Sequence, residues 1–216
     1  MTRFDCVIFD MDGLVIDSEM LSFGLMRDIA REQGSDLSFE EYSPMIGRGM
    51  DFFEGYIKEL FPSYKGTANF LTDYQKRYKD ALAEGKLRLK KGFLELIEAI
   101  DARGIKKVLA SSNIKKAVDS SLGALNAARF FDAIVYGELV EHTKPAPDIF
   151  LKAAELAGTP PERCLVLEDS PPGIRAAHAA GMSAIIVPDT IEPEAEILKL
   201  CERRCDSLLD VMDCLD

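Results

Sequence analysis

Short apolar segments alternate with longer segments of helical spacing over most of the chain. The first apolar segment, 6–9, is rich in β-branched residues, as expected of a strand buried on both faces of a parallel sheet. Similar segments predict further strands at 107–110, 133–136, 164–167 and 184–187. Between them, the spacing of apolar residues predicts helices at 93–102, 114–125, 147–157, 173–180 and 194–202. This alternation indicates a doubly wound α/β fold, in which helices cover both faces of a parallel sheet.

A different pattern separates the first strand from the rest of the chain. Residues 17–87 contain no strand-like segment, and their apolar residues fall at helical spacing over 18–33, 51–60 and 67–83. A short acidic helix and a loop marked by proline and glycine, 43–49, lie among these helices. We therefore expect an α/β core made of 1–16 and 88–216, with a small helical bundle, 17–87, inserted after the first strand.

Composition and charge narrow the class of protein. The chain has 216 residues, of which 47% are hydrophobic and 29% charged, as in soluble globular proteins. The formal net charge is −11 and no cluster of Lys and Arg forms a basic face, which argues against a nucleic-acid partner. No apolar run approaches the length of a membrane span, and the N-terminus lacks the pattern of a signal peptide. We expect a cytoplasmic protein with no membrane partner, which is a monomer or a weak homodimer.

The five cysteines do not indicate a disulfide framework. Cys6 and Cys164 lie inside strand-like segments, where cysteine behaves as a small apolar residue. Cys201, Cys205 and Cys214 have no histidine nearby, which argues against a zinc site. We expect all five as reduced thiols.

Two aspartates follow the first predicted strand directly. Asp10 and Asp12 are one residue apart, so their side chains point to the same side of an extended chain. At about 4 Å and an effective dielectric constant near 20, two such carboxylates repel each other by roughly 4 kcal/mol. The alternative is that both are solvated turn residues before Gly13. A buried pair would need a cation or a shared proton.

Polar side chains also follow the next three predicted strands. They are Ser111, Ser112 and Asn113 after the second strand, Lys144 after the third, and Glu168 and Asp169 after the fourth. The carboxyl ends of parallel strands meet at one edge of a doubly wound sheet. We therefore expect acids, hydroxyls and one lysine to share a single crevice.

Each of these groups taken alone has a simpler interpretation. Ser112 and Asn113 are favourable helix N-caps, and Lys144 could be a solvated loop residue. Glu168 and Asp169 could favour the start of the helix that follows them. Their occurrence at successive strand ends favours a joint catalytic role.

Phosphoryl transfer is the chemistry that uses such a set of groups. Asp10 could attack phosphorus, and Asp12 could protonate the leaving oxygen and later take a proton from water. Ser111 and the amides after it could hold the transferring group while Lys144 neutralises its charge.

Mg²⁺ is the metal that these oxygen ligands suit. Asp10, a backbone carbonyl near Asp12, and Asp169 with Glu168 beside it are the expected ligands.

These motifs resemble those of the haloacid dehalogenase-like superfamily of phosphohydrolases, and the resemblance covers nearly the whole chain. Asp10-Met11-Asp12-Gly13-Leu14-Val15 looks like the first motif of that family, Ser111 like the second, Lys144 like the third, and Glu168-Asp169 like the fourth. The residues around these motifs look like those of the β-phosphoglucomutase-like branch. The resemblance implies a Rossmann-like core, a helical cap, Mg²⁺, a nucleophilic Asp10 and an acid/base Asp12.

Departures from the mutase bear on the substrate. The mutase has a histidine where this chain has Ser22, and the arginine that grips its distal phosphate falls at Met50. Lys79 aligns with a cap lysine of the mutase, although it could equally be a solvated helix residue. In the loop, Gly47 and Arg48 are expected to contact substrate, or Arg48 is an exposed charge.

We expect a Mg²⁺-dependent phosphatase that hydrolyses a small phosphorylated metabolite, with a sugar phosphate as the expected class. The substrate-contacting residues would be Ser112, Asn113, Gly47, Arg48 and Lys79. The alternatives are a phosphosugar mutase and a non-catalytic phosphometabolite-binding protein. Asp12 argues against the dehalogenases, which lack the second aspartate, and no cap lysine stands out for phosphonate hydrolysis.

Overall fold

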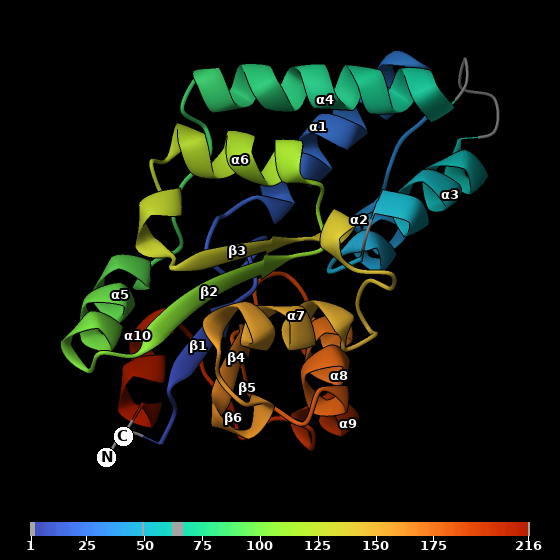
Figure 1. Cartoon of the computed structure of the whole chain (residues 1–216). Coiled ribbons are helices and arrows are strands. Elements are labelled where there is room, and N and C mark those ends of the chain that lie inside the picture. Colours follow the sequence, from blue (N-terminus) through green and yellow to red (C-terminus); the bar gives the residue numbers. More distant parts are fainter. Residues whose placement is uncertain (1–2, 49, 62–66, 216) are drawn as a thin grey trace.

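A six-stranded sheet forms the centre of the computed structural model, which describes residues 3–48, 50–61 and 67–215 (Figure 1). The strands are β1 (Cys6–Phe9), β2 (Lys106–Ser111), β3 (Ala133–Tyr136), β4 (Cys164–Glu168), β5 (Ser183–Ile186) and β6 (Arg203–Arg204). Their order is β3-β2-β1-β4-β5-β6, and every neighbouring pair is parallel. The predicted Rossmann-like doubly wound fold is confirmed.

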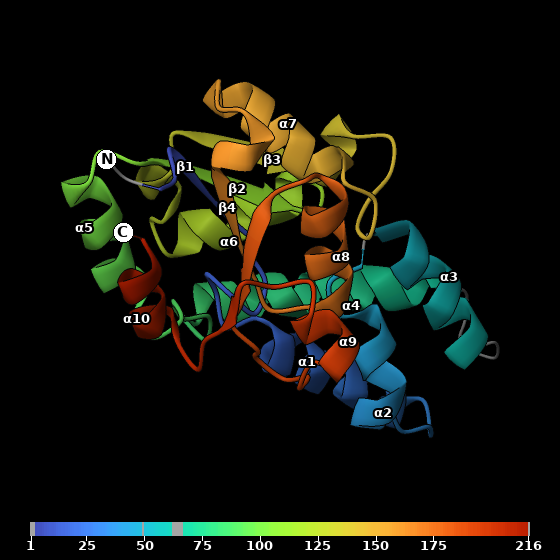
Figure 2. The same ribbon diagram turned by 90° about the horizontal axis from the view of Figure 1, so that it is seen from below.

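Helices cover both faces of this sheet because successive strand residues point to opposite sides. Val7 and Phe9 pack on one face, against α5 (Phe93–Ala102), α6 (Lys115–Ala124) and α10 (Leu208–Val211). Cys6 and Ile8 pack on the other face, against α7 (Asp148–Ala157), α8 (Pro171–Ala179) and α9 (Ala195–Leu198). Figure 2 shows α6 and α7 on opposite sides of the strands.

Between β1 and α5 the described chain is helical, as the sequence predicts. The helices are α1 (Glu19–Glu32), α2 (Phe39–Tyr42), α3 (Met50–Leu60) and α4 (Thr67–Ala83). They enclose a hydrophobic cluster of their own, which includes Phe23, Met26 and Phe70. Gly49, in the predicted loop, lies outside the described residues. The boundaries of this helical insert, 17 and 87, stay a prediction.

Short 3₁₀ turns connect several of these elements. They are Ser43–Met45, Ala128–Phe130, Gly137–Leu139, Pro161–Arg163 and Met212–Cys214. Among the helices of the described ranges, none is both long enough and apolar enough to cross a bilayer.

The predicted helix at 194–202 is wrong in length. Only Ala195–Leu198 is α-helical, because the following backbone adds to the edge of the sheet. The amide of Glu202 donates to the carbonyl of Ala184 at 2.8 Å, and that of Cys205 to the carbonyl of Ile186 at 2.9 Å. These bonds produce the two-residue strand β6, which has no pattern of its own in the sequence.

Two connections join the helical insert to the sheet, and they pair with each other. The amide of Asp17 donates to the carbonyl of Arg88, and the amide of Lys90 donates to the carbonyl of Val15, both at 2.9 Å. The insert therefore leaves and rejoins the core at one place, beyond the carboxyl end of β1. The strand order changes direction between β1 and β4, where doubly wound sheets open a crevice.

Candidate active site

The carboxyl ends of β1 and β4 bring three acids together. Phe9 lies opposite Leu167 in the parallel register, so the residues that follow both strands share one edge of the sheet. One carboxylate oxygen from each of Asp10, Glu168 and Asp169 lies within 4.8 Å of the other two, and all three residues are buried. Burial raises the pKa of Asp10 and of Asp169 well above the ordinary range, and the charge of Glu168 adds to both shifts. This closely packed set of oxygen donors fits a divalent cation, which would offset their repulsion.

Two glycines make room for these acids. At Gly13, with a φ of +79°, a Cβ atom would lie 2.3 Å from Oδ2 of Asp169. At Gly173 a Cβ atom would lie 1.8 Å from Oε1 of Glu168. Both positions therefore require glycine for the acids to keep their places.

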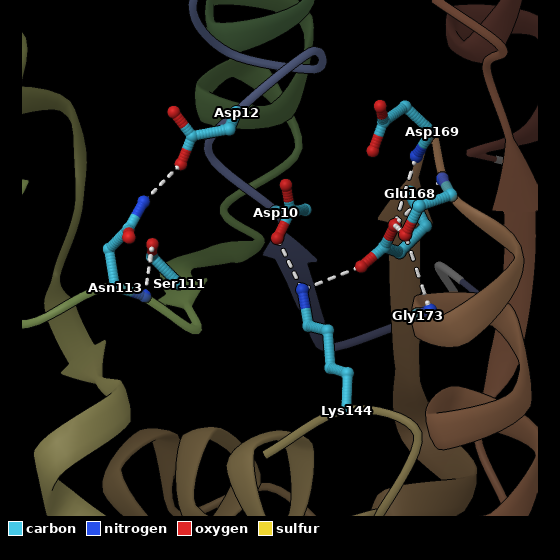
Figure 3. Close-up of polar contacts among 9 residues, drawn as sticks. Asp10, Asp12, Ser111, Asn113, Lys144, Glu168, Asp169 and Gly173 are labelled. Carbon is cyan, nitrogen blue, oxygen red and sulfur yellow. Dashed lines mark hydrogen bonds and ion pairs between the residues drawn. The ribbon is translucent and has the colours of Figure 1, made fainter. Parts of the chain in front are cut away.

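Lys144 reaches this group from the loop after β3. It is only 2% exposed, its Nζ contacts Oδ1 of Asp10, and it lies 2.6 Å from Oε1 of Glu168 (Figure 3). Burial alone lowers the pKa of Lys144, but the charges of Asp10 and Glu168 outweigh that effect and raise it. The interpretation of Lys144 as a solvated loop lysine is wrong. It is a buried cation between two carboxylates.

Glu168 also organises the loop that carries Asp169. Its Oε2 accepts hydrogen bonds from the backbone amides of Asp169 and Ser170, at 3.1 and 3.0 Å, and from the Ser170 hydroxyl at 2.8 Å. The Ser170 hydroxyl accepts in turn from the amide of Gly173 at 3.3 Å, which caps α8. Both oxygens of Glu168 are thus engaged, and the acid holds Lys144 and the loop in one arrangement.

The carboxylate of Asp12 points away from the other acids (Figure 3). Its Oδ1 accepts from the Ser18 hydroxyl at 2.6 Å, and its Oδ2 from the side-chain amide of Asn113 at 2.9 Å. Burial raises the pKa of Asp12, and these two hydrogen bonds oppose the shift. Within the described part of the chain, the cluster of three acids does not include Asp12. The orientation of Asp12 is set by Ser18 and Asn113, separately from that of Asp10.

Ser18 is a residue that the sequence analysis missed. Serine is a typical N-cap, and it stands directly before α1, but its side chain makes no capping bond to that helix. The hydroxyl instead donates to Asp12, and the residue is 2% exposed. In the sequence, Ser18 cannot be told from an ordinary cap.

The end of β2 places two hydroxyls beside the acids. Ser111 is 1% exposed, and its Oγ accepts from the amide of Asn113 at 3.2 Å. The Oγ of Ser112 is buried and has no hydrogen-bond partner within 3–48, 50–61 and 67–215. The alternative that Ser112 or Asn113 caps the next helix is wrong, because the N-cap of α6 is Ile114. These side chains face the cavity instead.

A cavity of about 520 Å³ lies between the helical insert and the core, and Asp10 is the member of the acid cluster that lines it. Gly47, Arg48 and Lys79, expected to contact substrate, line it together with Asp10 and Asp12. Arg48 and Lys79 are both exposed, and the Arg48 guanidinium lies 4.8 Å from the centroid of the Phe52 ring.

Glu19 is a second residue that the sequence analysis missed. It lines the cavity, is 7% exposed, and accepts a hydrogen bond from the Tyr42 hydroxyl at 2.6 Å. Burial, with the nearby charge of Asp12, raises the pKa of Glu19 to about 7. From the sequence alone, an acid in the first turn of a helix is explained by the helix dipole.

Comparison with known proteins agrees with this geometry. The family model described as haloacid dehalogenase-like hydrolase matches residues 7–187. The phosphorylated carbohydrates phosphatase of Thermotoga maritima is 30% identical over 84% of this chain and 83% of its own length. The protein SUPPRESSOR OF QUENCHING 1 of Arabidopsis thaliana is 36% identical over 88% of this chain, which spans only 18% of that longer protein.

Solved structures share the fold. The crystal structure of CbbY from Rhodobacter sphaeroides in complex with phosphate has a TM-score of 0.79 and 27% identity, with 96% of each chain covered. The expected enzyme class, a phosphoric monoester hydrolase, is confirmed by these matches. The chain belongs to the haloacid dehalogenase-like hydrolase family.

Proposed function

We propose that this chain is a Mg²⁺-dependent phosphatase of a small phosphorylated metabolite, in the sugar phosphate class, acting through an aspartyl phosphate on Asp10. The observation that carries the proposal is the buried group of Asp10, Glu168 and Asp169 with Lys144 in contact, of which Asp10 lines the cavity. The similarity to a phosphorylated carbohydrates phosphatase supports the substrate class.

The first half of the reaction uses the two aspartates in different roles. A carboxylate oxygen of Asp10 attacks phosphorus, and the bond from phosphorus to the leaving oxygen breaks. Asp12, in its protonated form, gives its proton to that oxygen. The raised pKa of Asp12 supports a proton-carrying role.

The second half regenerates both acids. Asp12 takes a proton from a water molecule, whose oxygen attacks phosphorus, and the bond from phosphorus to Asp10 breaks. Inorganic phosphate leaves, Asp10 is again a carboxylate, and Asp12 is again protonated.

The remaining polar groups position the phosphoryl oxygens. The unpartnered, buried Oγ of Ser112 and the hydroxyl of Ser111 are suited to donate to them, and Lys144 neutralises their charge. Asp10, Asp169 and Glu168 would hold Mg²⁺, with a backbone oxygen near Asp12. The cation would stabilise the negative charge that develops on the transferring group.

The test of the nucleophile is Asp10→Asn, assayed by p-nitrophenol release from p-nitrophenyl phosphate. We expect a loss of at least about 10³-fold, because the amide cannot form the covalent intermediate. The matched control is Asp5→Asn, an exposed acid paired with Arg163 at 2.7 Å, which we expect to stay within about twofold of wild type. Chelation with EDTA should abolish wild-type activity, and added Mg²⁺ should restore it. Full Mg²⁺-dependent activity in Asp10→Asn would end the nucleophile assignment.

The mutase alternative is separated by product analysis. Ser22, where the mutase has a histidine, accepts a hydrogen bond from the Tyr74 hydroxyl at 3.0 Å. We expect phosphate release to exceed interconversion of sugar 1- and 6-phosphates. Binding of phosphometabolites without any turnover would instead support the non-catalytic alternative.

A further inference from the structure

One wall of the cavity is aromatic. Tyr74 and Tyr78 of α4 are four residues apart, so they lie on one face of that helix. Their ring centroids are 5.8 Å apart, and the ring of Phe53 from α3 lies 6.0 Å from that of Tyr74. All three side chains line the cavity and are partly exposed. We refer to Phe53, Tyr74 and Tyr78 as the aromatic wall.

The hydroxyl groups of this wall are already engaged. The Tyr74 hydroxyl donates to Oγ of Ser22 at 3.0 Å, and the Tyr78 hydroxyl lies 3.2 Å from Oγ of Ser121 on α6. Figure 1 shows α4 and α6 side by side, which permits the second bond. What the wall offers to a ligand is therefore mainly ring surface.

Further apolar side chains line the same cavity. Met26 and Met45 come from the helical insert, and Ile114 from the segment that precedes α6. Methionine adapts its shape to ring systems and makes favourable contacts with their edges. The cavity volume, about 520 Å³, is within the range of roughly 300–1,000 Å³ typical of pockets for drug-sized ligands.

The aromatic wall lies on the side of the site where the leaving group would be. The Tyr74 hydroxyl bonds to Ser22, one turn of α1 after Ser18, and the Ser18 hydroxyl donates to Asp12 at 2.6 Å. Tyr78 lines the same cavity as Asp12. Asp12 is the residue that would protonate the leaving oxygen. Glu19 also lines this region and offers hydrogen bonding to a hydroxylated group.

We propose that the organic part of the substrate is a sugar that carries a flat heteroaromatic ring, as in a nucleoside 5′-monophosphate, and that the ring packs against Phe53, Tyr74 and Tyr78. This inference deepens the proposed function and rests on it. A plain sugar phosphate would leave the ring faces of the aromatic wall in contact with water. Stacking of a base on aromatic side chains removes that contact and tolerates different bases.

The test compares two ligands that share a ribose and a 5-phosphate, of which only one carries a heteroaromatic base. Ribose 5-phosphate and a nucleoside 5′-monophosphate (adenosine or uridine) are titrated by calorimetry, in the presence of Mg²⁺, into the Asp10→Asn protein. Affinity measured on this variant does not depend on turnover. We expect the nucleotide to bind at least about tenfold more tightly than ribose 5-phosphate.

A pair of variants assigns this preference to the aromatic wall. Phe53→Leu, added to Asp10→Asn, keeps an apolar side chain but removes the ring, and we expect the preference to fall below about threefold. The control is Phe39→Leu in the same background. Phe39 packs in the insert with its ring 5.5 Å from that of Phe23, and it does not line the cavity, so the preference should persist.

Each outcome has one meaning. Equal affinity for the two ligands, or tighter binding of ribose 5-phosphate, overturns the inference, as does an equal loss of preference in both leucine variants. Preferential nucleotide binding without phosphate release by the wild-type enzyme would leave the inference standing and defeat the proposed phosphatase. Thermal unfolding of each variant checks that the protein is folded.

Discussion

Lys144 and Glu19 are both buried and ionisable, but their surroundings act on their charges in opposite directions. Lys144 lies between Asp10 and Glu168, which stabilise its positive charge. Glu19 has the Tyr42 hydroxyl as its hydrogen-bond donor, and burial, together with the nearby negative charge of Asp12, disfavours its ionisation. Substituting each residue should therefore change the free energy of unfolding with opposite sign.

Lys144→Met should be strongly destabilising. Removal of the ammonium leaves two buried carboxylates without their cation, which typically costs about 3–5 kcal/mol of unfolding free energy. Urea unfolding at pH 8 without divalent cations measures the loss. Lys152→Met is the control, because Lys152 forms an exposed pair with Glu155 at 2.9 Å and should lose less than about 1 kcal/mol. Equal losses in the two variants would contradict the buried-cation assignment.

Glu19→Gln should be stabilising at high pH. The folded-state pKa of Glu19 is about 7, against an ordinary value of 4.5, so the unfolded chain ionises first as pH rises. The wild type therefore loses up to about 3 kcal/mol of unfolding free energy from this group between about pH 4.5 and pH 7. Glutamine cannot ionise and can still accept the Tyr42 hydrogen bond.

The measurement for Glu19→Gln is urea unfolding at several pH values. The stability difference between variant and wild type should be near zero at pH 4 and should grow to its full size by pH 8. A constant difference across this range would show that Glu19 ionises as it does in the unfolded chain.

At the scale of elements, the first turn of α8 packs directly against the side chain of Glu168. Pro171 and Pro172 occupy the first turn, where the missing amide protons cost nothing, so the helix begins two residues before the predicted position at 173. The turn brings Gly173 against Glu168, with no room for a side chain. The same glycine therefore serves both the helix and the acid cluster.

Gly173→Ala should disrupt that arrangement. The added methyl group overlaps Glu168, so we expect a loss of stability and at least about a tenfold loss of hydrolytic activity. Gly123→Ala is the matched control in α6, where a Cβ atom would have no neighbour within 4 Å. It should gain roughly 0.4–1 kcal/mol of stability and keep its activity. Similar behaviour of the two alanine variants, by urea unfolding and phosphatase assay, would contradict this account of Gly173.

Sequence patterns predict some elements well and others poorly, for physical reasons. The strands from β1 to β5 each contain a short apolar run, and the sequence pattern predicts them. These runs are mostly buried, except in β3, where Val135 is the fully buried residue. The edge strand β6 is exposed at Arg203 and Arg204, and its existence depends on bonds to β5 rather than on its own residues.

The candidate site likewise contains groups that the sequence pattern predicts and contacts that it does not. Asp10 and Asp169 directly follow β1 and β4, and Lys144 lies in the loop after β3. The topology of a doubly wound sheet is enough to predict that these segments converge. The contact of Tyr78 with Ser121 depends on how the helical insert rests on the core, which periodicity does not describe.

At the scale of the whole molecule, the helical insert approaches the acid loop of the core closely at Gly47. Gly47, with a φ of +73°, lies so near Ser170 that a Cβ atom would be 2.4 Å from the Ser170 Oγ. That hydroxyl also donates to Glu168. The position of the insert and the order of the acid loop are therefore linked through one hydroxyl group.

Gly47→Ala should impair activity more than its backbone strain alone explains. Gly34→Ala is the matched control, because Gly34 has a similar φ of +77° but no neighbour within 4 Å of a Cβ atom. Both variants should lose roughly 1–2 kcal/mol of stability from the left-handed conformation. Only Gly47→Ala should also lower kcat/KM for p-nitrophenyl phosphate, by about tenfold or more. Equal kcat/KM values for the two variants would show that Gly47 does not connect the helical insert with the acid loop.

The pairing of β1 with β4 has a consequence for the order of events during synthesis. Asp10 is synthesised well before Glu168 and Asp169, because these acids lie far apart in the sequence. A nascent or truncated polypeptide that stops before β4 therefore contains Asp10 without the two acids beside it. Such a fragment cannot assemble the buried group of three acids, so we expect hydrolytic activity only once β4 has joined the sheet.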